Sequence, residues 1–356
     1  MITVRNIFRI IVSHKALSAG IFLILAACII ALFAYWLAPD HTTYANRMVL
    51  EIAGKEPGHR QLFLKIKPSE FRQKNIFQTL INGNEEMEQW IPITDYQKRG
   101  DSLFVEKYVD DGIAESMVYH AYLLNKTHSI ATHTYYFGTD KFGRDILSRL
   151  IIGTRVSLTV GAIAVLISLT IGILLGAIAG YRGGKSDQLI MWLVQIVWSI
   201  PTILLVLGVM LLLGKGTVQV FLAIGLSLWV NVARMVRVQV LSAKEQTYVE
   251  AARVLGFSDF RILFIHILPN IMGAVWVLAA SNFATAIMLE AGLSFLGIGI
   301  QPPQPSWGLM MKEHYNFIIT NHPMLAIIPG VAIMMMVLAF HLVGNGLRDL
   351  LDVKSS

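Results

Sequence analysis

The sequence predicts an all-α polytopic membrane protein with six spans and a small α+β insertion outside the membrane. Hydrophobic residues make up 55% of the 356-residue chain and charged residues only 15%, whereas an ordinary soluble protein carries about 25% charged residues. Apolar runs of about 20 residues, each long enough to cross a bilayer, recur along the chain. One long polar segment separates the first run from the second and predicts the insertion.

Six apolar runs predict the membrane-spanning helices. Their approximate limits are 17–38, 156–180, 189–213, 217–233, 271–290 and 324–346. Gly and Pro within the last two runs fit this interpretation because membrane helices tolerate both. The first run is longer than the apolar part of a typical signal peptide. We therefore expect an uncleaved anchor there, with a cleaved signal peptide as the alternative.

Basic residues predict the side of the membrane that each short loop faces, because Lys and Arg are enriched in cytoplasmic loops. With the N-terminus inside, the short outside loops hold only Lys215 and Lys312, and the inside segments hold the other basic residues of the short loops. We therefore expect both termini and the loop 234–270 in the cytoplasm. The net charge of +6 is spread over separate loops, which favours topology over a nucleic-acid-binding patch.

The polar segment predicts a division of the chain into three parts. These are an N-terminal part with the first span, an extracytoplasmic inserted domain and a membrane core, at 1–40, 41–135 and 136–356. Within the insertion, alternating patterns and turn residues predict strands at 61–67 and 102–105, a turn at 82–84, and short helices at 76–81 and 114–124. A docking surface, a cap over a pathway and a structural spacer remain alternative roles for the insertion.

The string FGTDKFGRDILSRLIIGTRVSLTVG at 137–161 predicts a turn followed by a helix start. Thr139 or Asp140 would supply an oxygen to the free N–H groups at that start. Four apolar residues at helical spacing predict a short amphipathic helix on the membrane surface before the second span: Ile146, Leu147, Leu150 and Ile151. Arg149 and Arg155 would then lie near the outer interface.

The loop 239–270 predicts a compact cytoplasmic knob of two short helices. The first would run from Gln239 to Leu255 and stop at Gly256, a residue favoured just after helix C-termini. The second would start at Ser258 or Asp259 as the N-cap, end at Ile267, and be followed by the next span from Pro269. An amphipathic loop resting on the bilayer is the alternative.

Side chains of this knob predict a docking surface for another protein. Small Ala251 and Ala252 would allow close approach, and Glu250 would face a basic partner. Apolar anchors would come from three larger side chains: Leu255, Phe257 and Phe260.

Three strings in the chain resemble those of ABC-importer permeases, and they occur in the family's order. EAARVLGFSDFRILFIHILPN at 250–270 resembles the loop that docks on the ATPase. The string at 137–161, and EAGLSFLGIGIQPPQPSWG at 290–308, are similar to those of dipeptide, oligopeptide and nickel permeases. Over roughly 135–349 the chain is therefore similar to the second permease subunit of such an importer.

The resemblance implies a type I ABC importer fold in a bacterial plasma (inner) membrane. It implies a non-catalytic subunit without a cofactor, and a cargo of peptides or, alternatively, nickel or metal chelates. The implied partners, besides the lipid bilayer, are a second homologous permease, ABC ATPase subunits and an extracytoplasmic substrate-binding protein.

The resemblance also implies a path between two permeases, to which the fifth span would contribute. Small residues in that span permit close helix contact, so we expect a subunit interface there; packing within one subunit is the alternative. Ser281, Asn282 and Thr285 would lie nearest the cargo. Glu290 is the one acidic residue in or at the edge of an apolar span, and it would face the path or a neighbouring subunit.

Other classes of function are matched less well by the sequence. The chain has no G-x-x-x-x-G-K-[ST] string for ATP and no His-Glu-x-x-His or paired-cysteine string for a metal. A stand-alone channel or an ion-driven carrier is the alternative class, but a carrier normally holds several ionisable groups within its spans. A scaffold or sensor built around 41–130 would leave the knob unexplained.

Overall fold

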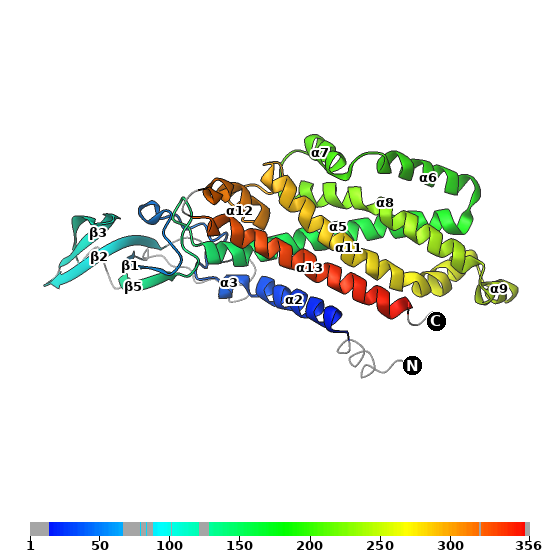
Figure 1. Ribbon diagram of the computed structural model, residues 1–356, viewed down its shortest axis with the longest axis horizontal. Coiled ribbons are helices and arrows are strands. Elements are labelled where there is room, and N and C mark those ends of the chain that lie inside the picture. Colours follow the sequence, from blue (N-terminus) through cyan, green and yellow to red (C-terminus); the bar gives the residue numbers. More distant parts are fainter. Residues whose placement is uncertain are drawn as a thin grey trace. The chain divides into compact units, whose positions relative to one another are not determined.

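The computed structural model describes residues 14–66, 79, 83, 88–100, 102–120, 128–319 and 322–352. Within them the chain forms long helices and a five-stranded antiparallel sheet (Figure 1). Contacts divide the chain into two compact units. Unit 1 comprises Met1–Cys28, Ser157–Gln301 and Gly330–Ser356, and unit 2 comprises Ile29–Val156 and Pro302–Pro329.

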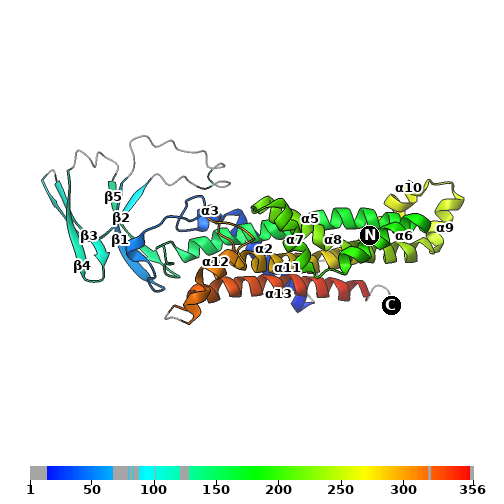
Figure 2. The ribbon, with the colours of Figure 1, turned by 90° about the horizontal axis from the view of Figure 1, so that it is seen from above.

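Long apolar helices build unit 1, where they run side by side (Figure 2). They are α2 (Lys15–Leu32), α5 (Ile146–Arg182), α6 (Gly184–Trp198), α7 (Thr202–Leu213), α8 (Thr217–Lys244), α11 (Leu268–Phe295) and α13 (Met324–Asp352). The helices α2, α5 and α13 continue into unit 2. Among the described residues, five helices are long and apolar enough to cross a membrane, or six if α6 and α7 form one span. The predicted polytopic helical membrane protein is confirmed.

The start of α5 differs from the prediction. This helix of 37 residues is continuous, so the separate surface helix predicted before the second span is wrong: its apolar spacing continues directly into the span. The predicted N-cap is also wrong. Asp145 accepts a hydrogen bond from the Ser148 N–H at 2.9 Å, whereas Asp140 accepts the N–H groups of Phe142 and Arg144 within the preceding turn.

The predicted third and fourth spans also need correction. The run 189–213 is not one straight helix, because α6 and α7 meet at 93°. Pro201 lies at the bend, where its missing N–H and rigid ring interrupt the helix. The fourth span was predicted to end at 233, but α8 continues to Lys244.

A row of glycines brings α5 against α8. Gly172, Gly176 and Gly180 recur every four residues and therefore share one helix face. An added Cβ would lie 2.4 Å from Val232 Cβ at the first, 2.5 Å from the Ala233 carbonyl oxygen at the second and 2.7 Å from the Arg237 carbonyl oxygen at the third. The missing side chains thus let the two helices approach closely.

Unit 2 contains the antiparallel sheet, whose strand order is β4-β3-β2-β1-β5. The strands are β1 (His59–Ile66), β2 (Gln89–Arg99), β3 (Ser102–Asp110), β4 (Ile113–His120) and β5 (His128–Tyr135). Five buried residues form one apolar core on this sheet: Leu64, Ile91, Ile93, Leu103 and Val105. Short helices complete the unit: α3 (Ala34–Leu37), η1 (Leu50–Ile52), α12 (Trp307–His314) and η3 (Tyr315–Ile318).

The strands predicted at 61–67 and 102–105 are confirmed as parts of β1 and β3, the first over 61–66, since residue 67 lies outside the described residues. The helix predicted at 114–124 is wrong, because residues 113–120 pair with β3 as strand β4. The predicted helix at 76–81 and turn at 82–84 lie outside the described residues, apart from positions 79 and 83.

Candidate functional site

The loop between α8 and α11 forms a knob of short helices in unit 1. Its elements are α9 (Thr247–Val254), α10 (Asp259–Arg261) and the π-helix η2 (Ile262–Ile267), which continues into α11. The predicted helix from Gln239 to Leu255 is wrong at its start. Residues 239–244 belong to α8, and two non-helical residues separate α8 from α9. Its predicted stop is confirmed, since Gly256 has a φ of 76°.

The second part of the knob begins as predicted. Ser258 is the N-cap of α10, and its Oγ accepts the Arg261 N–H at 3.4 Å. Phe257, just before this cap, stacks on the His266 ring with 5.6 Å between centroids. These contacts fold α10 and η2 back on the end of α9.

The inner face of the knob belongs to the core of unit 1. Val249 is 0% exposed and Ala252 4% exposed, and both pack in one cluster with Ile262 and Ile267. Ala252 is buried inside the unit and Phe257 is half-buried against His266, so these two contribute less exposed surface than the other predicted docking residues, whose roles stay predictions.

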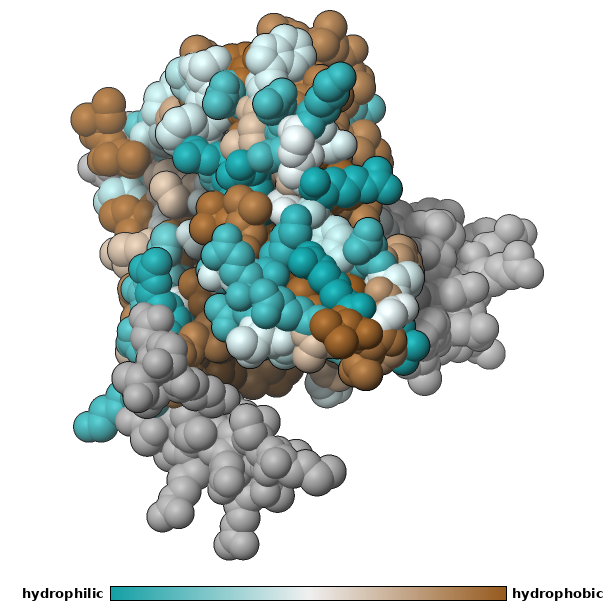
Figure 3. All heavy atoms as spheres, turned by 90° about the vertical axis from the view of Figure 1, so that its right-hand side faces the viewer, coloured by the Kyte–Doolittle hydropathy of each residue, from teal (hydrophilic) through white to brown (hydrophobic). Residues whose placement is uncertain are grey.

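The outer face of the knob carries the remaining predicted docking residues. Glu250, Ala251, Leu255, Gly256 and Phe260 are exposed. Val254, which the prediction missed, is 88% exposed; its place beside Leu255 in the sequence was the available signal. Viewed from this end, the molecule shows apolar patches among hydrophilic side chains (Figure 3).

Polar contacts tie the knob to the ends of two long helices, α5 and α11, and tie α5 to α8 beside it. The Tyr181 hydroxyl of α5 donates to Asp259 Oδ1 at 2.6 Å, and Lys244 Nζ of α8 donates to the Tyr181 carbonyl at 2.7 Å. Asn270 Nδ2 of α11 donates to the Tyr248 hydroxyl at 3.2 Å. The knob is thus attached to α5 and α11, and α8 is attached in turn to α5.

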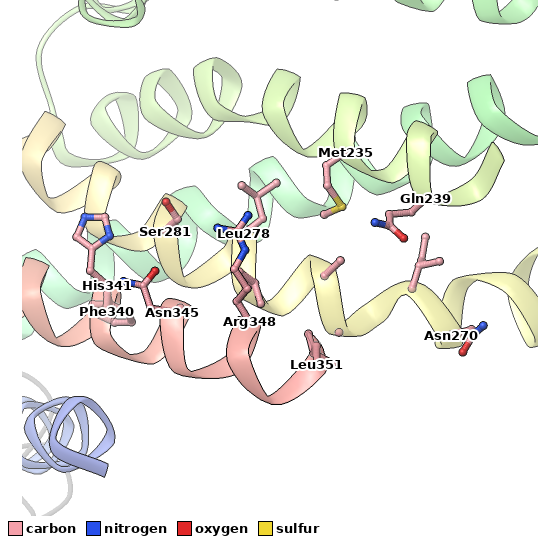
Figure 4. Close-up of a pocket in the computed structure, with 15 residues that line it drawn as sticks. Met235, Gln239, Asn270, Leu278, Ser281, Phe340, His341, Asn345, Arg348 and Leu351 are labelled. Atoms are coloured by element: carbon pink, nitrogen blue, oxygen red, sulfur yellow. The ribbon is translucent and has the colours of Figure 1, made fainter. Parts of the chain in front are cut away.

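A groove of about 860 Å³ lies where faces of α8, α11 and α13 meet (Figure 4). Of the residues predicted along a path, Ser281 lines it. Asn282 is 3% exposed and does not line the groove. Thr285 is half-buried and its hydroxyl donates to the Ser281 carbonyl at 3.0 Å.

Glu290 does not reach the groove. Its carboxylate is fully buried and accepts a hydrogen bond from the Ser294 hydroxyl at 2.7 Å, with the Ser157 hydroxyl at 3.5 Å. These two partners belong to its own chain, and the roles expected for Glu290 at the path or at a neighbouring subunit stay predictions.

Four of the small residues of α11 are internal. Ala279, Ala280, Ala284 and Ala286 are all buried within the chain. This burial favours the alternative in which they pack helices within one subunit.

A buried ionic cluster lies in unit 2, where the sequence predicted an interfacial Arg149. That residue is 1% exposed and lies inside the protein. Arg144 and Arg149 each donate to Glu313 of α12, and Arg144 also donates to Asp140. Ligand atoms of Asp140, Glu313 and His314 lie within 4.8 Å of one another. Because the two guanidinium groups already neutralise the two carboxylates, the cluster is an ion-pair network and a poor cation site.

Comparison with known proteins gives a consistent group of relatives. Residues 172–355 match the family described as "Binding-protein-dependent transport system inner membrane component". The chain is similar to the oligopeptide transport system permease protein OppC of Bacillus subtilis, with 41% identity over 220 residues, 62% of this chain and 72% of that one. It is similar to the glutathione transport system permease protein GsiD of Pectobacterium atrosepticum, with 42% identity over 221 residues, 62% of this chain and 73% of that one.

Among solved structures, the chain is similar to the MetNI methionine ABC transporter in an inward-facing conformation. The TM-score is 0.44 at 19% identity, over 56% of this chain and 95% of that one.

Proposed function

This chain belongs to the family of binding-protein-dependent transport system inner membrane components, and on that premise we propose which cargo it carries and how its surfaces work. It is a non-catalytic, multi-pass permease subunit of an ABC importer. Membership implies ATPase and binding-protein partners in general.

The cargo is a peptide or glutathione. The support is an identity of 41% to an oligopeptide permease and of 42% to a glutathione permease, each over 62% of this chain. Both cargoes are short amides with a free carboxylate, so one kind of path would serve either of them.

The knob is the docking site for an ABC ATPase. The observation that carries this proposal is its exposed apolar side chains: Val254, Leu255 and Phe260 are 88%, 71% and 70% exposed on a segment that is hydrogen-bonded to two long helices, α5 and α11. Exposed apolar side chains grouped on a rigid element are typical anchors of protein interfaces. Glu250 and Ala251 complete this surface.

The knob and both ends of the chain face the cytoplasm, where ATP is available. In unit 1 the start of α2 and the end of α13 lie toward the same end as α9 (Figure 1), and the short segments assigned to that end hold most of the basic residues found in short loops. A second homologous permease, two ATPase subunits and an extracytoplasmic binding protein complete the importer.

Reconstitution with the products of the neighbouring genes tests this function. An affinity-tagged chain should co-purify an ATPase and a second permease, and proteoliposomes should take up tri-alanine or glutathione only with ATP and the binding protein. Uptake by this chain alone, without ATP, would instead identify a stand-alone channel or carrier.

A further inference from the structure

The geometry points to a carboxylate-binding site inside the groove, formed by His341, Asn345 and Arg348 of α13. We propose that these side chains receive the free carboxylate of the cargo as it moves through the cytoplasmic half of the path. This site rests on the proposed function, since it presumes that the groove belongs to the path and that the cargo is a peptide or glutathione.

The three residues occupy one face of α13. Their spacing of four and then three residues places them in a row along the helix, and all three line the groove (Figure 4). On the facing helices, Gln239 of α8 and Ser281 of α11 add polar groups. Donors from three helices thus converge on one space.

The charge of the groove favours an anion. The lining residues that the structure describes include one arginine and no acidic residue. Near this end of unit 1, other basic side chains are already engaged: Arg237 binds Asp187 at 2.5 Å, and Lys244 donates to the Tyr181 carbonyl at 2.7 Å. Within the described part of the chain, Arg348 has no such partner and is exposed to the groove.

The chemistry of the row matches a carboxylate better than a neutral group. A guanidinium presents two parallel N–H donors that fit both oxygens of a carboxylate. The Asn345 amide and the His341 ring can donate to the remaining lone pairs. A volume of about 860 Å³ is within the range of pockets that hold ligands of the size of a short peptide.

Uptake of tri-alanine and of its C-terminal amide tests the site in the complete, reconstituted importer. Arg348→Gln should lower kcat/KM for tri-alanine about tenfold, the effect of losing one partly solvated charge-assisted pair, and leave that for the amide nearly unchanged. For each importer, wild type and Arg348→Gln, the informative quantity is the ratio of kcat/KM for tri-alanine to kcat/KM for its amide. The binding protein is the same in the two importers, so its own preference cancels when these ratios are compared.

Two further variants make the result specific. Arg348→Lys keeps the charge but loses the two parallel donors, so uptake of tri-alanine should lie between those of Arg348→Gln and the wild type. Lys185→Gln removes an exposed charge of unit 1 outside the groove. It should not change the ratio of kcat/KM for tri-alanine to kcat/KM for the amide.

The outcomes separate this inference from the proposed function. If wild-type importer carries tri-alanine and Arg348→Gln keeps the wild-type ratio, the site is wrong and the function stands. If the wild-type importer carries neither tri-alanine nor glutathione, the proposed cargo fails and the site fails with it. A variant that no longer assembles with its partners would show that Arg348 is structural, which also overturns the site.

Discussion

The Arg144 guanidinium donates a hydrogen bond to Glu313 Oε2 at 2.9 Å, although 169 positions separate the two residues in the sequence. Arg149 donates to the same oxygen at 3.0 Å, and Arg144 Nε donates to Asp140 at 2.6 Å. Both arginines are at most 2% exposed. In unit 2 this network joins the turn before α5 to α12, and it balances two buried positive charges with two negative ones.

Glu313→Gln should destabilise unit 2. The neutral amide would leave two buried guanidinium groups with one carboxylate, and breaking a buried ion pair costs about 3–5 kcal/mol. Thermal unfolding of the purified chain in detergent measures the effect. Lys312→Gln, an exposed change on the same helix, is the matched control. Equal melting temperatures for Glu313→Gln and the control would show that the network adds no net stability.

Three of the four residues of this network lie close together in the sequence. Asp140, Arg144 and Arg149 stand in one string, but nothing local indicates that their partner lies in α12, because the pairing depends on tertiary packing. The groove is a similar case: its polar residues are visible in the sequence, but their convergence requires the relative placement of three helices.

The length of an apolar run predicted the membrane-spanning helices. The errors arose in segments whose pattern fits more than one kind of secondary structure. A run of about 20 apolar residues has few alternatives to a spanning helix, so each predicted run falls on apolar helix, although the bend within 189–213 and the end of α8 were missed. The sequence pattern of residues 113–120 fits a strand or a short helix. In the structure these residues form strand β4 because they pair with β3. Pro201 was a readable break, whereas the end of α8 at Lys244 was not, because apolar residues continue past the predicted membrane boundary.

Val254→Asp on the knob should weaken ATPase binding at least tenfold and leave folding unchanged. Val254 is 88% exposed, so a charge there costs the chain little, whereas an apolar pocket on a partner would have to desolvate it. Co-purification of the ATPase and its stimulated activity measure the effect. Gln188→Asp adds the same charge at an exposed position of α6 and should behave as wild type. Wild-type coupling in Val254→Asp would remove this residue from the interface.

Charge reversal at Glu250 gives an independent test of the same surface. Glu250 is exposed on α9, and Glu250→Lys should lower transport and ATPase stimulation by placing a cation against a basic partner. Membrane insertion should stay normal because the change lies outside the spans. Transport by the reconstituted complex at the wild-type rate would exclude a role for the carboxylate.

Cysteine labelling tests the orientation of the chain. In a Cys28→Ala background, Ser116→Cys on β4 should react with an impermeant thiol reagent in intact spheroplasts. Glu245→Cys, between α8 and α9, should react only after the membrane is opened. Both positions are exposed, so access depends on the side of the membrane. The reverse pattern would place the knob outside and contradict its ATPase role.

His133 should make the sheet sensitive to acid. Burial, together with nearby Lys65 and Arg47, lowers the pKa of His133 to about 4. Between pH 6.5 and 4 the unfolded chain therefore binds a proton that the folded chain does not, so stability is lost as the pH falls through this window. The loss is at most about 3 kcal/mol. His133→Phe should abolish it, because a phenyl ring does not titrate.

The difference in melting temperature between wild type and His133→Phe at pH 7 and pH 4.5 measures this effect. The melting temperature of the wild type alone is less informative, because burial also raises the pKa of Asp145 to about 6. That shift acts in the opposite direction: its stabilisation is present at low pH and lost as the pH rises through 6. A difference that does not change with pH would show that His133 titrates normally.

Gly176 should be the least replaceable residue of the α5–α8 contact. A Cβ there would lie 2.5 Å from the Ala233 carbonyl oxygen, a backbone atom that cannot move without displacing α8. Gly176→Ala should cost about 1–3 kcal/mol by overpacking, and Gly176→Leu should prevent a folded, monodisperse protein from accumulating. Gly208 on α7 has no atom within 4 Å of such a Cβ, so Gly208→Ala and Gly208→Leu are the matched controls. Yield and melting temperature in detergent decide the comparison. If Gly176→Leu matched Gly208→Leu in both, the close approach of α5 and α8 would not be required for the fold.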